Sequence, residues 1–236
     1  MKVLVVQNYA DTGLGQVATA LAEANADVTS VMAYDGDALP PTPEGFDAIV
    51  VLGGAQTALD DEGSPWLLPL AALMREFADS DRAVLGICLG SQLMARAYGA
   101  DNLIGAAPEF GWQHVSVTPE GAADPVLSVA GGTFPIFQWH DDTFTLPRGA
   151  VRLAGNAAAH NQAFRIGRAG YAMQFHFEAD RALLDEWSVT FADTLAARQP
   201  GWGERRMADA EAFGKGADAA GLAIARAWVS TIRPAP

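Results

Sequence analysis

The sequence predicts an α/β fold in which a mostly parallel sheet is covered by helices on both faces. Short apolar runs alternate with helical patterns through the first hundred residues, which is typical of parallel strands joined by helices. After Gly99 the strand-like segments become shorter and are separated by Gly, Pro and Asp, which favours a few added antiparallel strands. From Asp180 onward the pattern is again helical.

The first hundred residues contain the segments expected to form the parallel sheet. The expected strands are short apolar runs, and the third run ends in the paired glycines Gly53 and Gly54. The second expected helix has helical periodicity and carries Pro65 near its start, where proline is tolerated. We expect strands at residues 3–7, 27–34, 47–54 and 83–87, and helices at residues 17–26, 65–78 and 91–99.

The rest of the chain is expected to extend this sheet and then to end in helices. We expect short strands at residues 112–119, 133–139, 150–156, 162–167 and 171–177. Helices are expected at residues 181–198 and 217–232, with a loop at residues 199–206. No repeat or linker interrupts the chain, so we expect one domain over residues 1–236, with the motifs in residues 1–180 and C-terminal helices in residues 181–236.

Composition limits the classes of function. Half of the 236 residues are hydrophobic, and the formal net charge of −13 disfavours nucleic acids and anionic membranes as partners. A single cysteine excludes an internal disulfide and a multi-cysteine metal cluster. The first apolar run is too short for a secretory signal, and no run approaches the ~18 apolar residues of a membrane span. We therefore expect a soluble, cytoplasmic protein.

The single cysteine, Cys88, lies between Gly86 and Gly90 where an expected strand gives way to an expected helix. Glycines two residues before and after a nucleophile describe a nucleophile elbow, a tight turn that exposes the side chain at a helix N-terminus. The helix dipole there favours the thiolate, and the N–H of the following residue, Leu89, can bind an oxyanion. The alternative is that Cys88 is a small buried apolar residue.

A nucleophilic cysteine needs a base, and His176 is the candidate among four histidines. Glu178 follows it by two positions at the end of an expected strand, and residues two apart on a strand point to the same face. If the strand has already ended at this point, only the proximity of the two residues in the sequence remains. Glu178 could therefore orient the imidazole and stabilise its protonated form. The alternative is a surface histidine beside a carboxylate.

These motifs together resemble the class I glutamine amidotransferases, and most of all their free-standing, GMP-synthase-like members. The segment GICLGSQ, residues 86–92, matches every fixed position of that family's nucleophile motif, and His176 and Glu178 complete a Cys-His-Glu triad. Further matching segments are VVLGGA at residues 50–55, FGWQHV from Phe110 and QWHDDTFTLP from Gln138. The resemblance implies a flavodoxin-like, three-layer sandwich and covers the chain from about Val3 to Glu178.

The chain departs from the family's usual pattern at three places. Phe177 stands where proline usually separates the triad histidine and glutamate, and Ala55 follows the paired glycines where proline is common. The family's frequent His-Gly-Asp appears as His140-Asp141-Asp142, which adds a carboxylate near the substrate. We expect the first two changes to preserve the site and the third to bear on substrate identity.

The resemblance implies that the Cys88 thiolate attacks the side-chain amide of glutamine. By the same resemblance, the N–H groups of Gly54 and Leu89 form the oxyanion hole, His176 transfers protons, and Glu178 orients the imidazole. The substrate would be held by Gln92 and by the backbone near His140 and Asp141. No metal or organic cofactor is implied. The ammonia would pass to a separate synthase subunit, or the chain would act alone on γ-glutamyl amides.

Alternative interpretations remain open at this level. Residues 13–18, GLGQVA, match a dinucleotide-binding pattern, with Asp35 at the spacing of a ribose-binding acid. A non-catalytic interaction module and a thiol hydrolase of the intracellular-protease-like type are the other candidates. Residues 60–62, an acidic run, are expected to form a solvated loop and not a metal site. Trp112 and Trp139 are expected near the pocket.

Overall fold

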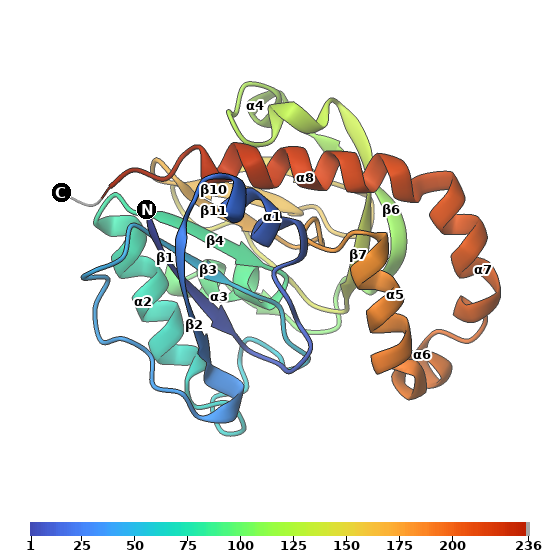
Figure 1. Cartoon of the computed structure of the whole chain (residues 1–236), viewed down its shortest axis with the longest axis horizontal. Coiled ribbons are helices and arrows are strands. Elements are labelled where there is room, and N and C mark those ends of the chain that lie inside the picture. The colour runs from blue at the N-terminus through green and yellow to red at the C-terminus, as the bar shows by residue number, and fades with distance from the viewer. Residues whose placement is uncertain (235–236) are drawn as a thin grey trace.

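The computed structural model describes residues 1–234 and contains one large sheet of nine strands (Figure 1). The strand order is β2-β1-β3-β4-β11-β10-β9-β6-β7. The first five strands in this order pair in parallel: β2 (Asp27–Met32), β1 (Lys2–Gln7), β3 (Ala48–Val51), β4 (Ala83–Ile87) and β11 (Gly170–Met173). The expected parallel sheet is confirmed.

The sheet is extended on one side by strands that pair antiparallel, as the short strand-like segments after Gly99 predict. These strands are β10 (Ala163–Ile166), β9 (Val151–Gly155), β6 (Glu109–Val117) and β7 (Thr133–His140). A separate two-stranded pair is formed by β5 (Asn102–Leu103) and β8 (Thr143–Phe144). The antiparallel half of the sheet therefore continues directly from the strand β11, which precedes His176.

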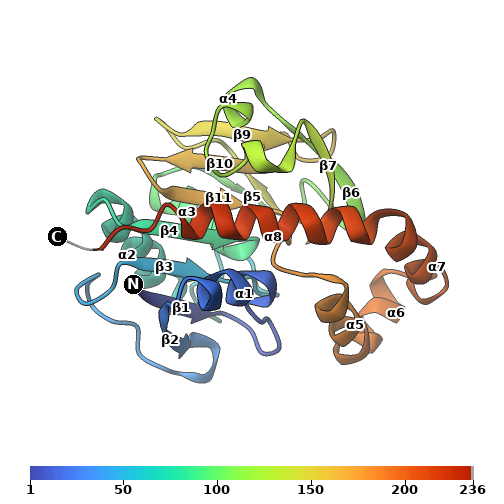
Figure 2. The ribbon, with the colours of Figure 1, turned by 45° about the horizontal axis from the view of Figure 1, so that its top comes forward.

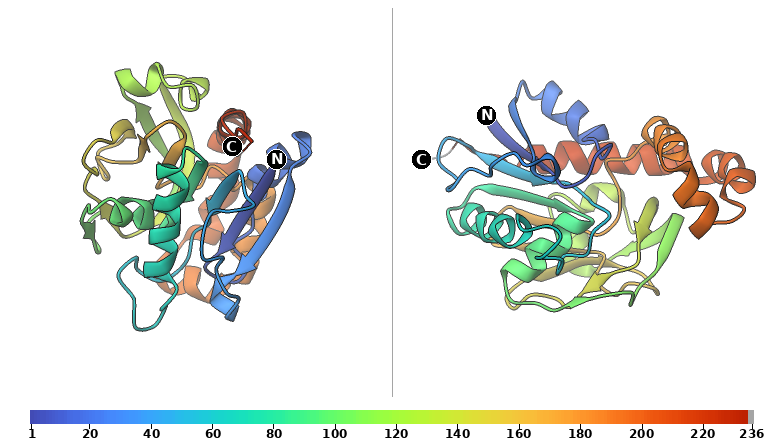
Figure 3. Two further views of the ribbon diagram at one scale, coloured as in Figure 1. Left: turned by 90° about the vertical axis from the view of Figure 1, so that its left-hand side faces the viewer. Right: turned by 90° about the horizontal axis from the view of Figure 1, so that it is seen from below.

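Helices cover both faces of the sheet, so the fold is the expected three-layer sandwich. Alternate residues of β1 belong to different cores: Val3 and Val5 to one cluster, Leu4 and Val6 to the other. The first cluster lies under α1 (Gly15–Glu23) and α8 (Lys215–Val229), which pack side by side (Figure 2). The second lies under α2 (Leu67–Asp79) and α3 (Leu89–Ala97), on the opposite side of the sheet (Figure 3).

The C-terminal helices form a separate group beside the sheet before α8 returns across it (Figure 1). They are α5 (Arg181–Thr190), α6 (Ala192–Arg198) and α7 (Trp202–Asp209), followed by a π-helical turn at Ala210–Gly214. The short elements are α4 (Pro119–Ala122) and the 3₁₀ turns Ala33–Asp35 and Ser128–Ala130. No helix within residues 1–234 has the length and apolar character needed to cross a membrane.

Two boundaries in this C-terminal group differ from the expectation. The helix expected at residues 181–198 is interrupted at Phe191, which ends α5 and precedes α6. The loop expected at residues 199–206 is wrong in its second half, because α7 begins at Trp202. Gly201 does adopt the left-handed turn conformation, with φ of 85°, so the turn is completed in fewer residues than expected.

The strand expected at residues 171–177 is also shorter in the structure. β11 ends at Met173, and beyond it Phe137 and His176 form only an isolated antiparallel bridge. His176 and Glu178 therefore do not lie on a regular strand, and the alternation argument that placed them on one face is wrong. Their juxtaposition has another cause, described below.

The glycine pattern at residues 13–18 is explained by packing. β1 ends at Gln7, and the helix α1 begins only at Gly15, which has a positive φ of 48°. The N–H of Gln16 donates to the carbonyl oxygen of Glu178 at 2.8 Å. A Cβ on Gly15 would lie 2.0 Å from that same oxygen. The helix terminus that would bind a phosphate in a dinucleotide site is thus occupied by protein backbone.

This packing predicts that Gly15 and Gly13 respond differently to the same substitution. We expect Gly15→Ala to lower the free energy of unfolding by at least about 2 kcal/mol, because of its positive φ and the backbone contact. Gly13→Ala is the matched control, since a Cβ there has no atom within 4 Å, and its stability should stay near that of the natural chain. Urea denaturation measures both, and equal stabilities for the two variants would contradict this account.

Candidate active site

Cys88 lies in the tight turn between β4 and α3. Its backbone has φ of 51° and ψ of −107° at the N-cap of α3, a strained conformation for a residue with a side chain. A Cβ on Gly86 would lie 2.4 Å from the carbonyl oxygen of Gly90. A Cβ on Gly90 would lie 2.2 Å from the carbonyl oxygen of Val51. Both glycines are therefore required by close backbone contacts, and the tight turn expected from the sequence is present. Cys88 is nevertheless largely buried, at 6% exposure, and it meets open space only where it lines the cavity described below.

The segment that carries His176 is held through its backbone by three other elements. The N–H of His176 donates to the carbonyl oxygen of Phe137 on β7 at 2.9 Å. The side-chain amide of Gln16, on α1, donates to the carbonyl oxygen of Phe177 at 3.0 Å. A Cβ on Gly221, in α8, would lie 2.2 Å from that oxygen, so α8 approaches the segment closely. These contacts take the place of the missing strand.

The imidazole of His176 lies between a carboxylate and the thiol. Its Nδ1 is 2.7 Å from Oε1 of Glu178, and both side chains are buried. A Cβ on Gly53 would lie 3.4 Å from Cε1 of His176 and 3.6 Å from Cβ of Cys88, so the imidazole and the cysteine meet beside this glycine. The ring of Trp187 packs edge-to-face against the imidazole at 5.3 Å. The histidine–glutamate pair forms with Phe177, not proline, between its members.

The environment of His176 raises its pKa well above the usual value. Burial is the largest single influence and would by itself lower the pKa, but attraction to Glu178 and Cys88 and hydrogen bonds to both outweigh it. A pKa raised on folding means that protonation of His176 stabilises the fold fully below about pH 6.5. This contribution is lost as the pH rises through the folded-state pKa. The arrangement favours an imidazolium next to the sulfur of Cys88.

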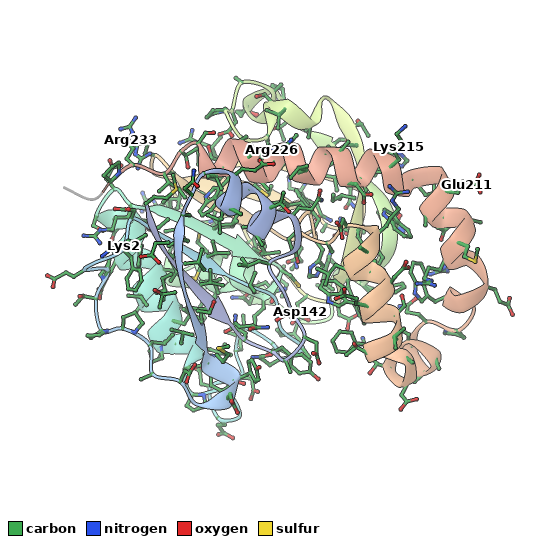
Figure 4. All side chains as sticks on the ribbon, in the orientation of Figure 1. Lys2, Asp142, Glu211, Lys215, Arg226 and Arg233 are labelled. Atoms are coloured by element: carbon green, nitrogen blue, oxygen red, sulfur yellow. The ribbon has the colours of Figure 1, made fainter. Side chains whose placement is uncertain are left out.

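A cavity of about 230 Å³ opens at Cys88 and His176. It lies at the carboxyl ends of the parallel strands, where open α/β sheets bind ligands. All five residues expected at the oxyanion and substrate positions line it, as do further residues of the C-terminal helices. The lining residues are Tyr9, Thr12, Gly54, Ala55, Gln56, Thr57, Cys88, Leu89, Gln92, Trp139, His140, Asp141, Asp142, His176, Trp187, Phe191, Thr194 and Arg198. In Figure 4, Asp142 is labelled between α5 and the loop that follows β1.

Gly54 and Leu89 line the cavity from two different turns. Leu89 is the first residue of α3, so its N–H has no acceptor within the helix. Gly54 follows the end of β3 and leaves little room for a side chain, because a Cβ there would lie 2.8 Å from Cδ2 of Leu89. The two residues are therefore close neighbours beside Cys88.

The polar side chains of Gln92 and His140 are largely engaged with the protein interior. The amide nitrogen of Gln92 donates to Oε1 of Gln174 at 3.2 Å. Nδ1 of His140 is 3.0 Å from the carbonyl oxygen of Asp142, and Nε2 lies 3.3 Å from Oε2 of Glu109 without hydrogen-bond alignment. Both side chains therefore contact other protein groups while their residues line the cavity.

Motif reasoning missed the part of the cavity wall that the C-terminal helices supply. These lining residues are Trp187 on α5, Phe191 at the junction, and Thr194 and Arg198 on α6. Their spacing of four, three and four residues places them on one face of a helical pattern, which is the signal that the sequence offers. Arg198 forms an ion pair with Asp141, through its Nη2 and the carboxylate Oδ2.

Of the two tryptophans expected near the pocket, one lines it. This is Trp139, whose carbonyl oxygen lies 3.8 Å from Sγ of Cys88. The indole ring of Trp139 packs against Trp187 and Phe191. Trp112 instead packs against Phe137 and Trp202 in the core. The expectation for Trp112 is wrong because its side chain points into the layer between the sheet and the C-terminal helices.

The acidic run at residues 60–62 is part of the surface structure. Asp61 accepts two hydrogen bonds of 2.7 Å from the guanidinium of Arg96, which lowers the pKa of its carboxyl. Asp60 accepts from the N–H of Gly63 at 3.1 Å. Among residues 1–234, no group of three or more His, Cys, Asp or Glu side chains is arranged to hold a metal ion.

Comparison with known proteins agrees with this geometry. The sequence profile of the glutamine amidotransferase class-I family matches residues 5–186. A solved structure of a glutamine amidotransferase from Thermotoga maritima superposes with a TM-score of 0.83 at 26% identity, covering 98% of this chain and 96% of that chain. At 98% coverage the match extends over the C-terminal helices, of which α6, α7 and α8 lie beyond the profile and α5 begins inside it.

Three curated relatives add functional names. YfeJ, a glutamine amidotransferase-like protein of Salmonella typhimurium, is 33% identical over 148 residues, or 61% of this chain and 62% of that protein. A glutamine-hydrolyzing GMP synthase subunit of Thermoplasma volcanium is 31% identical over 58% of this chain and 65% of its own. Gamma-glutamyl peptidase 4 of Arabidopsis thaliana is 27% identical over 60% of this chain and 57% of its own. The matches thus span less than two thirds of each relative.

The electrostatics of His176 predict the effect of neutralising its partner. We expect Glu178→Gln to move the titration midpoint of His176 to lower pH, because burial remains and the largest attraction is removed. Imidazole NMR of histidine-labelled protein measures the midpoint, with His176→Asn identifying the signal. Asp185→Asn, at an exposed carboxylate on α5, should leave the midpoint where it is. A midpoint that is unmoved by Glu178→Gln would contradict the account.

Proposed function

Because the chain belongs to the class-I glutamine amidotransferase family, we propose that it hydrolyses the side-chain amide of glutamine with Cys88 as the nucleophile. The observation that carries this proposal is that a strained cysteine and the histidine of a buried histidine–glutamate pair line one cavity together with Gly54 and Leu89. The strained turn fixes the sulfur. His176, whose pKa is raised, holds a proton beside it.

The first half of the proposed reaction forms an acyl-enzyme. The Cys88 thiolate adds to the γ-amide carbon, and the carbonyl electrons move to oxygen. The N–H groups of Gly54 and Leu89 are the proposed donors to this oxyanion, and donors of this kind are each worth about 10²–10³ in rate. The C–N bond then breaks, and the imidazolium of His176 gives its proton to the leaving nitrogen, which departs as ammonia.

The second half returns the enzyme to its starting state. Neutral His176 takes a proton from water, and the resulting hydroxide adds to the γ-glutamyl thioester. The C–S bond breaks, glutamate leaves, and the thiolate and the imidazolium are restored. Glu178 keeps Nδ1 of the imidazole oriented throughout and stabilises its positive charge. These steps use no metal or organic cofactor. We also propose that residues 1–236 act as one domain.

The fate of the ammonia separates two versions of this function. In the first, a separate synthase subunit receives it, and the relatives named as GMP synthase subunits support this version. In the second, the chain alone hydrolyses γ-glutamyl compounds, and the relative named as a gamma-glutamyl peptidase supports it. The second is also favoured by the aromatic wall of Tyr9, Trp187 and Phe191, which offers apolar surface for a leaving group larger than ammonia.

The proposed nucleophile is tested by removing it. We expect Cys88→Ala to lower the release of ammonia from L-glutamine, or of amine from γ-glutamyl amides, by roughly 10³-fold or more. His176→Asn should lower turnover comparably, since it removes the proton donor. Enzymatic detection of glutamate measures both, and thermal denaturation checks that the variants fold. Release that Cys88→Ala leaves unchanged would overturn the proposal.

A further inference from the structure

The charged groups at the cavity form a feature that the catalytic steps do not use. Of the described residues that line it, Arg198 is the one arginine, and no lysine is among them. Its guanidinium pairs with the carboxylate of Asp141, and the neighbouring Asp142 also lines the cavity. An ion pair of Arg198 and Asp141, next in sequence to a second carboxylate, therefore lines the space that holds Cys88 and His176.

This ion pair is open to solvent and available to a ligand. The side chains of Arg198 and Asp141 are 56% and 46% exposed. Exposed ion pairs contribute little to stability because water competes for both partners. A ligand that carries one positive and one negative group can therefore bind Asp141 and Arg198 in place of their mutual contact, with little loss of stability.

The position of the pair fits a substrate whose reacting carbon lies at Cys88. The carbonyl oxygen of Trp139 is 3.8 Å from the Cys88 sulfur. Asp141 follows Trp139 by two residues, which is at most about 7 Å between Cα atoms. An extended glutamine side chain separates its amide from its α-carbon by a few bonds, so its α-carboxylate and α-ammonium would reach the cavity rim.

We propose that Arg198 binds the α-carboxylate of the glutamyl donor and that Asp141 binds its α-ammonium, so that the resting ion pair is a zwitterion-recognition site. This inference rests on the proposed function, and it names the residues that select an α-amino acid over a simple amide. Arg198 lies on α6, outside the residues 5–186 that the family profile matches. The guanidinium suits this role because its planar N–H groups match the geometry of a carboxylate.

Two truncated substrates separate the two charges. Glutaramate keeps the carboxylate of glutamine and lacks the α-ammonium, whereas 4-aminobutanamide keeps the ammonium and lacks the carboxylate. We expect Arg198→Gln to lower kcat/KM for L-glutamine and glutaramate by about 10- to 100-fold, mainly through KM, as charged hydrogen bonds are lost. Its kcat/KM for 4-aminobutanamide should not fall.

The complementary variant should show the mirror pattern. Asp141→Asn is expected to lower kcat/KM for L-glutamine and 4-aminobutanamide and not for glutaramate. Arg206→Gln is the matched control, because Arg206 forms a similar arginine–aspartate pair with Asp185 and does not line this cavity. It should leave all three substrates unaffected. Equal losses on all three substrates in Arg198→Gln would overturn the inference, since they would indicate a structural effect.

A binding measurement tests recognition of the α-carboxylate and the α-ammonium independently of turnover. L-Glutamate should protect Cys88 from alkylation by iodoacetamide, followed by intact mass. Glutarate and 4-aminobutanoate, which each keep one of the two α-charges, should protect less than L-glutamate. Arg198→Gln should abolish protection by L-glutamate and glutarate. Absence of protection by L-glutamate in the natural chain would overturn the inference even where glutamine is hydrolysed. Conversely, protection without turnover of any amide would support it while the proposed function fails.

The leaving group provides a last distinction. A γ-glutamyl dipeptide carries a second carboxylate, which Arg198 could reach instead. We expect Arg198→Gln to impair L-glutamine and a γ-glutamyl dipeptide to a similar extent. Impairment of the dipeptide alone would overturn the inference and assign Arg198 to the leaving group.

Discussion

Two backbone carbonyls, those of Phe177 and Glu178, fix the imidazole that lies beside Cys88. The N–H and the side-chain amide of Gln16 donate to Glu178 and Phe177 at 2.8 and 3.0 Å, respectively. Gly15 and Gly221 allow α1 and α8 to approach them at distances that no Cβ would permit. The site therefore depends on the packing of two helices that are remote in sequence and meet each other on one face of the sheet.

Holding the segment by its backbone has a consequence for the side chains. The histidine–glutamate pair forms without proline between its members, and Phe177 fills that position with a buried ring that packs near Phe175. The histidine–glutamate pair is thus supported by the core beneath it, and Trp187 and Trp139 form part of the cavity wall. The cavity is built from two parts of the fold: the sheet positions Cys88 and His176, and α6 supplies Arg198.

The features that the sequence predicts well are those specified locally. The elbow at Cys88 follows from two glycines and a strand-to-helix change, and the apolar runs predict the parallel strands. The end of β11 at Met173 could not be read locally, because the strand-like pattern continues to Phe177, whereas residues 176–178 are held by contacts with β7 and α1 that are remote in sequence. The positions of Trp187 and Arg198 depend on how α5 and α6 fold back onto the cavity. The expectation of Trp112 at the pocket is wrong because its burial also depends on the folding of the C-terminal helices: the ring of Trp202, on α7, covers the ring of Trp112.

The most direct test of this account is the hydrogen exchange of the Gln16 amide. N–H groups in the first turn of a helix lack intrahelical acceptors and normally exchange fast. The bond from Gln16 to the carbonyl oxygen of Glu178 predicts strong protection of this one amide, whereas Gly203, also second in its helix, should exchange rapidly. Equally fast exchange at both positions would show that the segment of His176 is not held as described, and would contradict the account.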